Sequence, residues 1–84
     1  MNWEIILYNL KEAREHLEEI EKLVAEENPP SEIDFQTKLE HCYHHLNFAW
    51  NIRHSSTKKY AKMSDDNFNK WSKFPKKMKP YKVK

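Results

Sequence analysis

Apolar residues recur every three or four positions through the first third of the chain. The positions follow a 3-4-3-4-3-4 spacing, and they are Trp3, Ile6, Leu10, Ala13, Leu17, Ile20 and Val24. This spacing returns to one side of an α-helix each time, so it predicts a helix from about 2 to 26 with a coiled-coil-like seam. A period of two, which would indicate a strand, is not seen.

A second helix follows after a short break. Pro29 and Pro30 end the first helix, because proline disfavours the α conformation of the residue before it. Ser31 has the character of an N-cap, with Asp34 three residues on in a capping-box-like pair. The second helix is predicted from 32 to between 54 and 61. Its apolar face consists of Phe35, Leu39, Cys42, Leu46 and Ala49, widened by Tyr43 and Trp50. So short a break predicts an antiparallel hairpin.

A short third helix is predicted at 65–73. Ser64 is a good N-cap for it. Met63 and Phe68 stand where a hydrophobic staple would place them. Phe68 and Trp71 share a face and could dock on the hairpin. We therefore expect one domain over 1–74, followed by a basic tail over 75–84 that is extended or flexible.

The second helix carries an additional stripe beside its main apolar face. At 100° per residue, this stripe contains His41, His45, Phe48 and Ile52. A two-helix hairpin buries one face of each helix, so the stripe needs another cover. The candidates are the segment with Phe68 and Trp71, or a second subunit, and we expect both. The predicted fold is thus all-α: an antiparallel two-helix hairpin plus a short C-terminal helix, pairing as a dimeric four-helix bundle with the stripe at the interface.

The length and composition of the chain also indicate that its core needs additional stabilisation. With 84 residues, its core must be thin, and oligomerisation, a metal or disulfides are the usual remedies. A single cysteine, Cys42, excludes an intramolecular disulfide. No signal peptide and no apolar stretch of roughly 20 residues is visible, so we expect a cytoplasmic protein outside the membrane.

The charge is unevenly distributed along the chain. Residues 1–57 contain 5 Lys/Arg and 11 Asp/Glu, a net charge of −6, whereas residues 58–84 contain 10 Lys and 2 Asp, a net charge of +8. The acidic part and the basic part could attract each other or serve different partners.

Histidines suggest a metal site as one alternative. His41 and His45 form an i, i+4 pair, and antiparallel pairing places His16 level with His41 and Glu12 level with His45. Imidazoles with one carboxylate would suit zinc or iron. The competing interpretation makes them half-polar fillers beside an interface. Cys42 lies on the main apolar face, where a cysteine acts as a small hydrophobe rather than a nucleophile.

Polar and aromatic residues gather where the second helix ends beside the start of the first. A small pocket for an anion or a peptide carboxylate could form there, lined by Trp3, Asn47, Trp50, Asn51, Arg53 and His54. The alternative is a structural plug in which Arg53 stacks on tryptophan or pairs with Glu4.

Lysines of the C-terminal part raise the alternative of nucleic-acid binding. The candidate phosphate contacts are Lys70, Lys73, Lys76, Lys77 and Lys79, interleaved with aromatic residues that could stack on bases. Otherwise the aromatic residues dock on the hairpin and the lysines balance its acidic charge. No motif names a family. The sequence favours a non-enzymatic, self-associating helical protein without a cofactor, forming a homodimer and binding a macromolecular partner.

Overall fold

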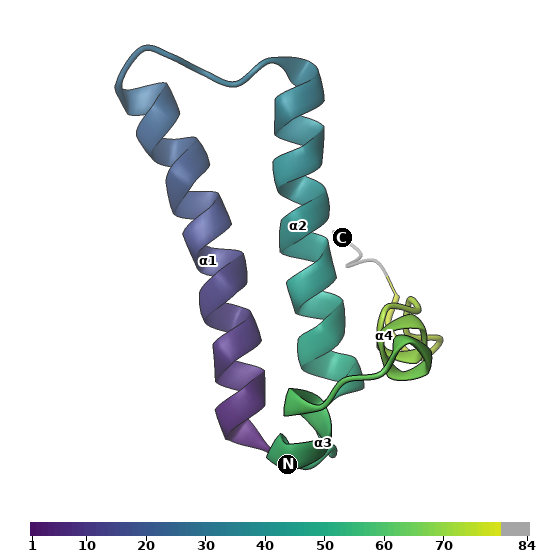
Figure 1. Ribbon diagram of the computed structural model, residues 1–84. Coiled ribbons are helices and arrows are strands. Elements are labelled where there is room, and N and C mark those ends of the chain that lie inside the picture. The colour runs from purple at the N-terminus through teal and green to yellow at the C-terminus, as the bar shows by residue number, and fades with distance from the viewer. Residues whose placement is uncertain (80–84) are drawn as a thin grey trace.

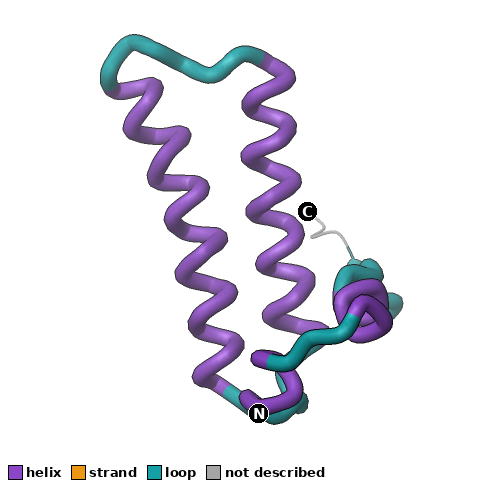
Figure 2. The backbone as a smooth tube through the Cα atoms, viewed as in Figure 1, coloured by secondary structure: helices purple, strands orange, loops and turns teal. Residues whose placement is uncertain are grey.

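The computed structural model describes residues 1–79 and consists, over that range, of four helices and no strand (Figure 1). Two are long: α1 spans Trp3–Ala25 and α2 spans Glu32–Asn51. Two are short: α3 spans Thr57–Ala61 and α4 spans Asp65–Trp71. Figure 2 shows α1 and α2 lying side by side, joined by a loop at one end. The predicted all-α hairpin with a short C-terminal helix is confirmed.

Local capping explains where the helices begin. Asn2, Ser31, Ser56 and Ser64 precede the four helices, and each side chain accepts a hydrogen bond from a backbone N–H of the first turn. The predicted caps at Ser31 and Ser64 are therefore confirmed. Continuation of α2 toward residue 61 is wrong, because α2 ends at Asn51 and Ser56 starts a separate helix.

A turn without glycine ends α1. Glu27 adopts a φ of 57°, which is the left-handed conformation usual at the position after a helix. The amide of Glu27 bonds to the carbonyl of Val24, and the amide of Asn28 bonds to the carbonyl of Leu23. This pair of bonds is a Schellman motif, and it directs the chain toward the two prolines and α2.

The core lies at the base of the hairpin, at the end where α3 and α4 dock. Its buried members are Ile5, Ile6, Phe48, Ala49, Ile52 and Trp71, with Tyr60 and Met63 packed against them. Phe48 is 2% exposed and Ile52 is 0% exposed. These two were expected at an interface between subunits, but here the chain's own C-terminal helices cover them. The docking of Trp71 follows the prediction, whereas Phe68 stays 45% exposed.

Contact between α1 and α2 toward the loop uses small residues. Ala13 and Cys42 are buried there, and the Cys42 thiol donates to the carbonyl of Ala13 over 3.5 Å. Larger seam residues lie at the margin of this contact: Leu10, Leu17, Val24, Phe35 and Leu46 are each 39–56% exposed. The seam predicted to be the hairpin core is thus half uncovered.

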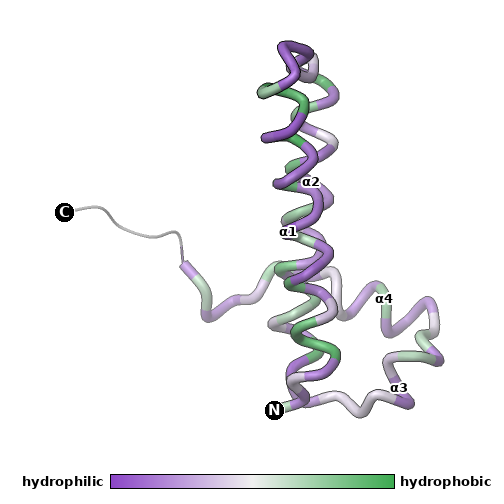
Figure 3. Tube along the Cα trace, turned by 90° about the vertical axis from the view of Figure 1, so that its left-hand side faces the viewer, coloured by the Kyte–Doolittle hydropathy of each residue, from purple (hydrophilic) through white to green (hydrophobic). Residues whose placement is uncertain are grey.

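The C-terminal segment folds back across α2. Asn51 donates to the carbonyls of Trp71 and Lys73 at 2.7 and 2.8 Å, and Pro75 is buried. Figure 3 shows α3 and α4 on one side of the hairpin and the segment after α4 crossing to the other side. The predicted flexible tail, 75–84, is thus packed at its first residue, and residues 80–84 lie outside the described part. None of the described helices combines the length and apolarity needed to span a membrane.

Candidate functional site

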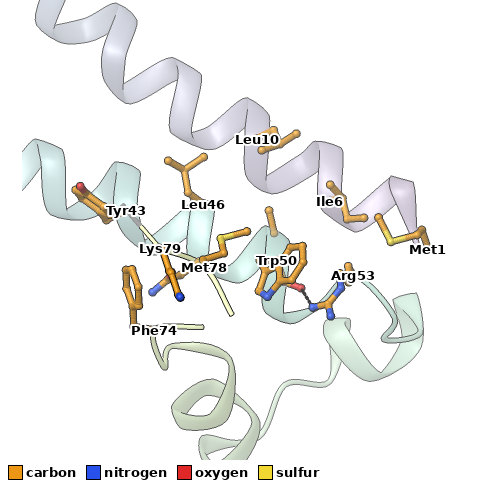
Figure 4. Close-up of a pocket in the computed structure, with 12 residues that line it drawn as sticks. Met1, Ile6, Leu10, Tyr43, Leu46, Trp50, Arg53, Phe74, Met78 and Lys79 are labelled. Carbon is orange, nitrogen blue, oxygen red and sulfur yellow. Dashed lines mark hydrogen bonds between the residues drawn. The ribbon is translucent and has the colours of Figure 1, made fainter. Parts of the chain in front are cut away.

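An apolar groove runs along the hairpin face that α3 and α4 leave open. It encloses about 520 Å³ and is lined by Met1, Ile6, Leu10, Tyr43, Leu46, Asn47, Ala49, Trp50, Arg53, Phe74, Met78 and Lys79. Both long helices and the C-terminal segment contribute, as Figure 4 shows. Several large side chains in it are well exposed, among them Tyr43 at 63% and Phe74 at 64%. Large exposed apolar side chains that gather in one groove are typical of an interaction surface.

A cation–π stack closes one end of the groove. The Arg53 guanidinium carbon lies 3.8 Å from the centroid of the Trp50 ring, and Arg53 Nη1 donates to the Trp50 carbonyl over 2.7 Å (Figure 4). Within residues 1–79 the ion pairs do not include Arg53, so the suggested pairing with Glu4 is not formed. The structural interpretation of Arg53, a cation stacked on tryptophan, holds.

The six residues predicted to form a polar pocket are only partly brought together. Asn47, Trp50 and Arg53 line the groove, but it is apolar rather than polar. The side-chain amide of Asn51 instead donates hydrogen bonds to the backbone carbonyls of Trp71 and Lys73. His54 is exposed, and Trp3 is 56% exposed; neither lines the groove.

The other face of the hairpin carries a cluster of histidines with one carboxylate. One ligand-type atom from each of Glu12, His16 and His45 lies within 4.8 Å of the other two, and all three residues are half-buried. The His16 ring centroid is 4.9 Å from that of His41 and 5.8 Å from that of His45. The predicted pairing of levels across the hairpin is therefore met. His41 itself is exposed, and Glu12 completes the compact group.

A buried amide orients one of these histidines. Asn9 is 0% exposed, and its side-chain nitrogen donates to the Ile5 carbonyl at 2.9 Å and to the Tyr60 hydroxyl at 3.2 Å. Its side-chain oxygen therefore acts as acceptor for His45 Nδ1, 3.1 Å away. Asn9 is not among the residues that the sequence pattern singles out as functional. The available signal was a polar residue inside the helix face between Ile6 and Ala13.

Burial shifts the protonation of the neighbouring groups. Desolvation lowers the pKa of His44, and the charge of His41 lowers it further. Desolvation also lowers the pKa of His45, with His44 adding to the shift and Glu12 opposing it. Both imidazoles are therefore favoured in their neutral form. Burial raises the pKa of the Cys42 thiol, which suits the predicted role as a core residue rather than a nucleophile.

Two aromatic residues among the C-terminal lysines are packed into the core and are not available to stack on bases. Trp71 is 3% exposed and its ring lies 6.1 Å from that of Tyr60, so both belong to the core. Lys70, Lys73, Lys76, Lys77 and Lys79 are all exposed, but Lys79 lies at the apolar groove. Phe68 and Phe74 remain exposed. This packing agrees with the alternative in which the aromatic residues dock on the hairpin.

Charge is polarised along the length of the hairpin. Residues 15–40, which form the half near the loop, contain nine carboxylates and two cations, a net charge of −7. The other described residues contain four carboxylates and eleven cations, a net charge of +7. The two helices of the acidic half are joined by an ion pair between Lys38 Nζ and Glu19 Oε1 at 2.7 Å. The molecule is thus strongly dipolar.

These features define a class: a small helical hairpin with a docked C-terminal segment, an open apolar groove and a histidine cluster. Comparison with protein-family models, curated proteins and solved structures finds no significant match to this chain. The function must therefore be inferred from the geometry.

Proposed function

We propose that this protein is a non-enzymatic helical module that self-associates through the apolar groove, two copies forming an antiparallel four-helix bundle. The observation that supports this most is the groove itself, with the half-exposed seam residues that continue it along both long helices. On the open face, the chain presents large apolar side chains that its own C-terminal helices leave uncovered. A macromolecular partner would then bind the pair rather than the single chain.

The shape of the face favours a second copy as its occupant. Four-helix bundles form when two helices from each side present apolar seams with heptad-like spacing. Leu10 and Leu17 continue such a seam on α1, and Leu46 flanks it on α2. About a two-fold axis at mid-hairpin, the groove of one copy would lie against the exposed seam residues near the loop of the other copy, Leu17, Val24 and Phe35.

The charge distribution favours the antiparallel orientation. In a parallel pair the two acidic halves would lie against each other, as would the two basic halves. An antiparallel pair places the −7 half of each copy against the +7 half of the other. Like charges held together at an interface weaken it, whereas complementary charges set its register.

Analytical ultracentrifugation across 1–200 µM tests the proposal. We expect a dimer with twice the 10.3 kDa chain mass. The substitution Leu46→Glu should produce a monomer, because a charge on each copy would face an apolar groove. Leu46 is already 49% exposed in the single chain, so helicity measured by circular dichroism should be retained.

Ile33→Glu provides the matched control. Ile33 is on the same helix and is 75% exposed, but it lies outside the groove. This variant should remain dimeric. A wild-type mass of 10.3 kDa at every concentration, or equal dissociation by both substitutions, would overturn the proposal.

A further inference from the structure

We propose that Glu12, His16 and His45 form a zinc site that joins α1 to α2 at mid-hairpin. The site lies away from the apolar groove, and it is independent of self-association. Two imidazoles and one carboxylate are a donor set used by zinc proteins, with a fourth position left to water. Glu12 and His16 come from one turn of α1 and His45 from α2, so a bound ion would bridge the two helices.

The three candidate ligand atoms lie slightly farther apart than the ligand atoms of a bound zinc ion. The three ligand-type atoms lie within 4.8 Å of one another. Zinc bonds of about 2.0–2.1 Å with tetrahedral angles place ligand atoms about 3.4 Å apart. Rotation of three half-buried side chains can supply this contraction, since the two backbones are already packed through Ala13 and Cys42 beside the site.

Asn9 prepares His45 for binding. Its oxygen accepts from His45 Nδ1, which assigns the proton to that nitrogen and leaves the lone pair on Nε2. Metal-bound histidines commonly donate their second N–H to a carbonyl or carboxylate, and this bond fixes the ring orientation. Asn9 is itself held by Ile5 and Tyr60, so the orienting group is rigid.

His41 lies next to the proposed site but is not one of its ligands. Its ring lies beside that of His16, but the residue is exposed and it is not part of the compact group. The group expected from the sequence was His16, His41 and His45 with Glu12 as the carboxylate. The compact set keeps Glu12, His16 and His45 and leaves out His41.

Titration of untagged, chelator-treated protein with zinc tests the proposal. Isothermal calorimetry should give one zinc per chain with a micromolar or tighter Kd. At a zinc concentration of about 100 times Kd, the melting temperature should rise by about 10 °C or more. Cobalt in place of zinc should give the intense visible absorption of a four-coordinate ion.

Variants separate this site from surface binding. Glu12→Gln and His16→Ala should each weaken zinc binding at least about tenfold, while His54→Ala, at an exposed position on the same chain, should leave it unchanged. The monomeric Leu46→Glu variant should bind zinc as wild type does, so the two proposals fail separately. Absence of saturable binding at 100 µM zinc, or binding lost in His41→Ala but retained in Glu12→Gln, would overturn the assignment.

Discussion

Asn9 and His44 are polar side chains placed among apolar ones, and each affects the molecule differently. Asn9 is the single buried polar residue in the part of the chain that the structure describes, and its three hydrogen bonds connect α1, α2 and α3. A satisfied buried polar group favours one packing arrangement over its alternatives. His44 makes no side-chain hydrogen bond within residues 1–79; its ring lies 4.4 Å from that of Phe48 and 5.6 Å from that of Phe68.

His44 should make the fold sensitive to acid. Its pKa in the folded chain lies below the ordinary value of 6.5, since burial beside the phenylalanine rings disfavours the imidazolium. The unfolded chain therefore binds this proton more readily than the folded chain. The free energy of unfolding keeps its full value above about pH 6.5 and decreases as the pH falls below it. Urea unfolding with EDTA present should show a lower midpoint at pH 5 than at pH 7.5.

The variant His44→Phe should reduce this pH dependence. It should not abolish it, because His45 shifts in the same direction. His54→Phe is the control, as His54 is exposed and lies beyond the end of α2. An unchanged slope for His44→Phe would contradict the assignment of the effect to His44.

At the scale of elements, the turn that ends α1 carries a conformation unusual for its residue. The whole chain lacks glycine, so Glu27 occupies the left-handed position that glycine normally takes at a helix end. The Schellman bonds from Glu27 and Asn28 hold it there. A β-carbon in this conformation costs about 1–2 kcal/mol.

Glu27→Gly should therefore stabilise the protein. The gain should be about 0.5–1 kcal/mol, because relief of the strain exceeds the added chain entropy of glycine in the unfolded state. For a domain of this size the melting temperature should rise by about 2–8 °C. Glu26→Gly is the matched control: Glu26 has a φ of −85°, so glycine there should lower the melting temperature.

At the scale of the whole molecule, the base of the hairpin is closed and the length of one face is open. The docked helices α3 and α4 form the core with the base, and the following segment borders the groove on the opposite side. The antiparallel pairing that we propose would use this open face and the opposed charges of the two halves.

Disulfide cross-linking should reveal the orientation of the pair. In a Cys42→Ala background, Tyr43→Cys places a thiol near the midpoint of the hairpin, on the groove. An antiparallel two-fold axis brings this position close to its copy, so oxidation should give a covalent dimer on a non-reducing gel. Phe35→Cys lies eight residues nearer the loop, so its two copies would be about 24 Å apart, too far to bridge. Efficient cross-linking of Phe35→Cys would indicate a parallel pair.

The sequence by itself determined the two long helices, the short helix near residue 65, the hairpin and the caps at Ser31 and Ser64, but not the separate helix α3. These depend on spacing along the chain and on hydrogen bonds within a few residues, and such signals are local. The same periodicity placed His16 and Glu12 at the correct levels opposite α2, because two antiparallel helices rise equally per residue.

Only the tertiary structure decided which apolar face is covered. Both faces of α2 are apolar. Which of them is buried depends on where Tyr60 of α3 and Trp71 of α4 dock. That docking buries Phe48 and Ile52, and it leaves Leu46 at an open groove. The metal-type group depended on tertiary packing too, because the close contact of α1 and α2 at Ala13 and Cys42 brings Glu12 and His16 of α1 close to His45 of α2.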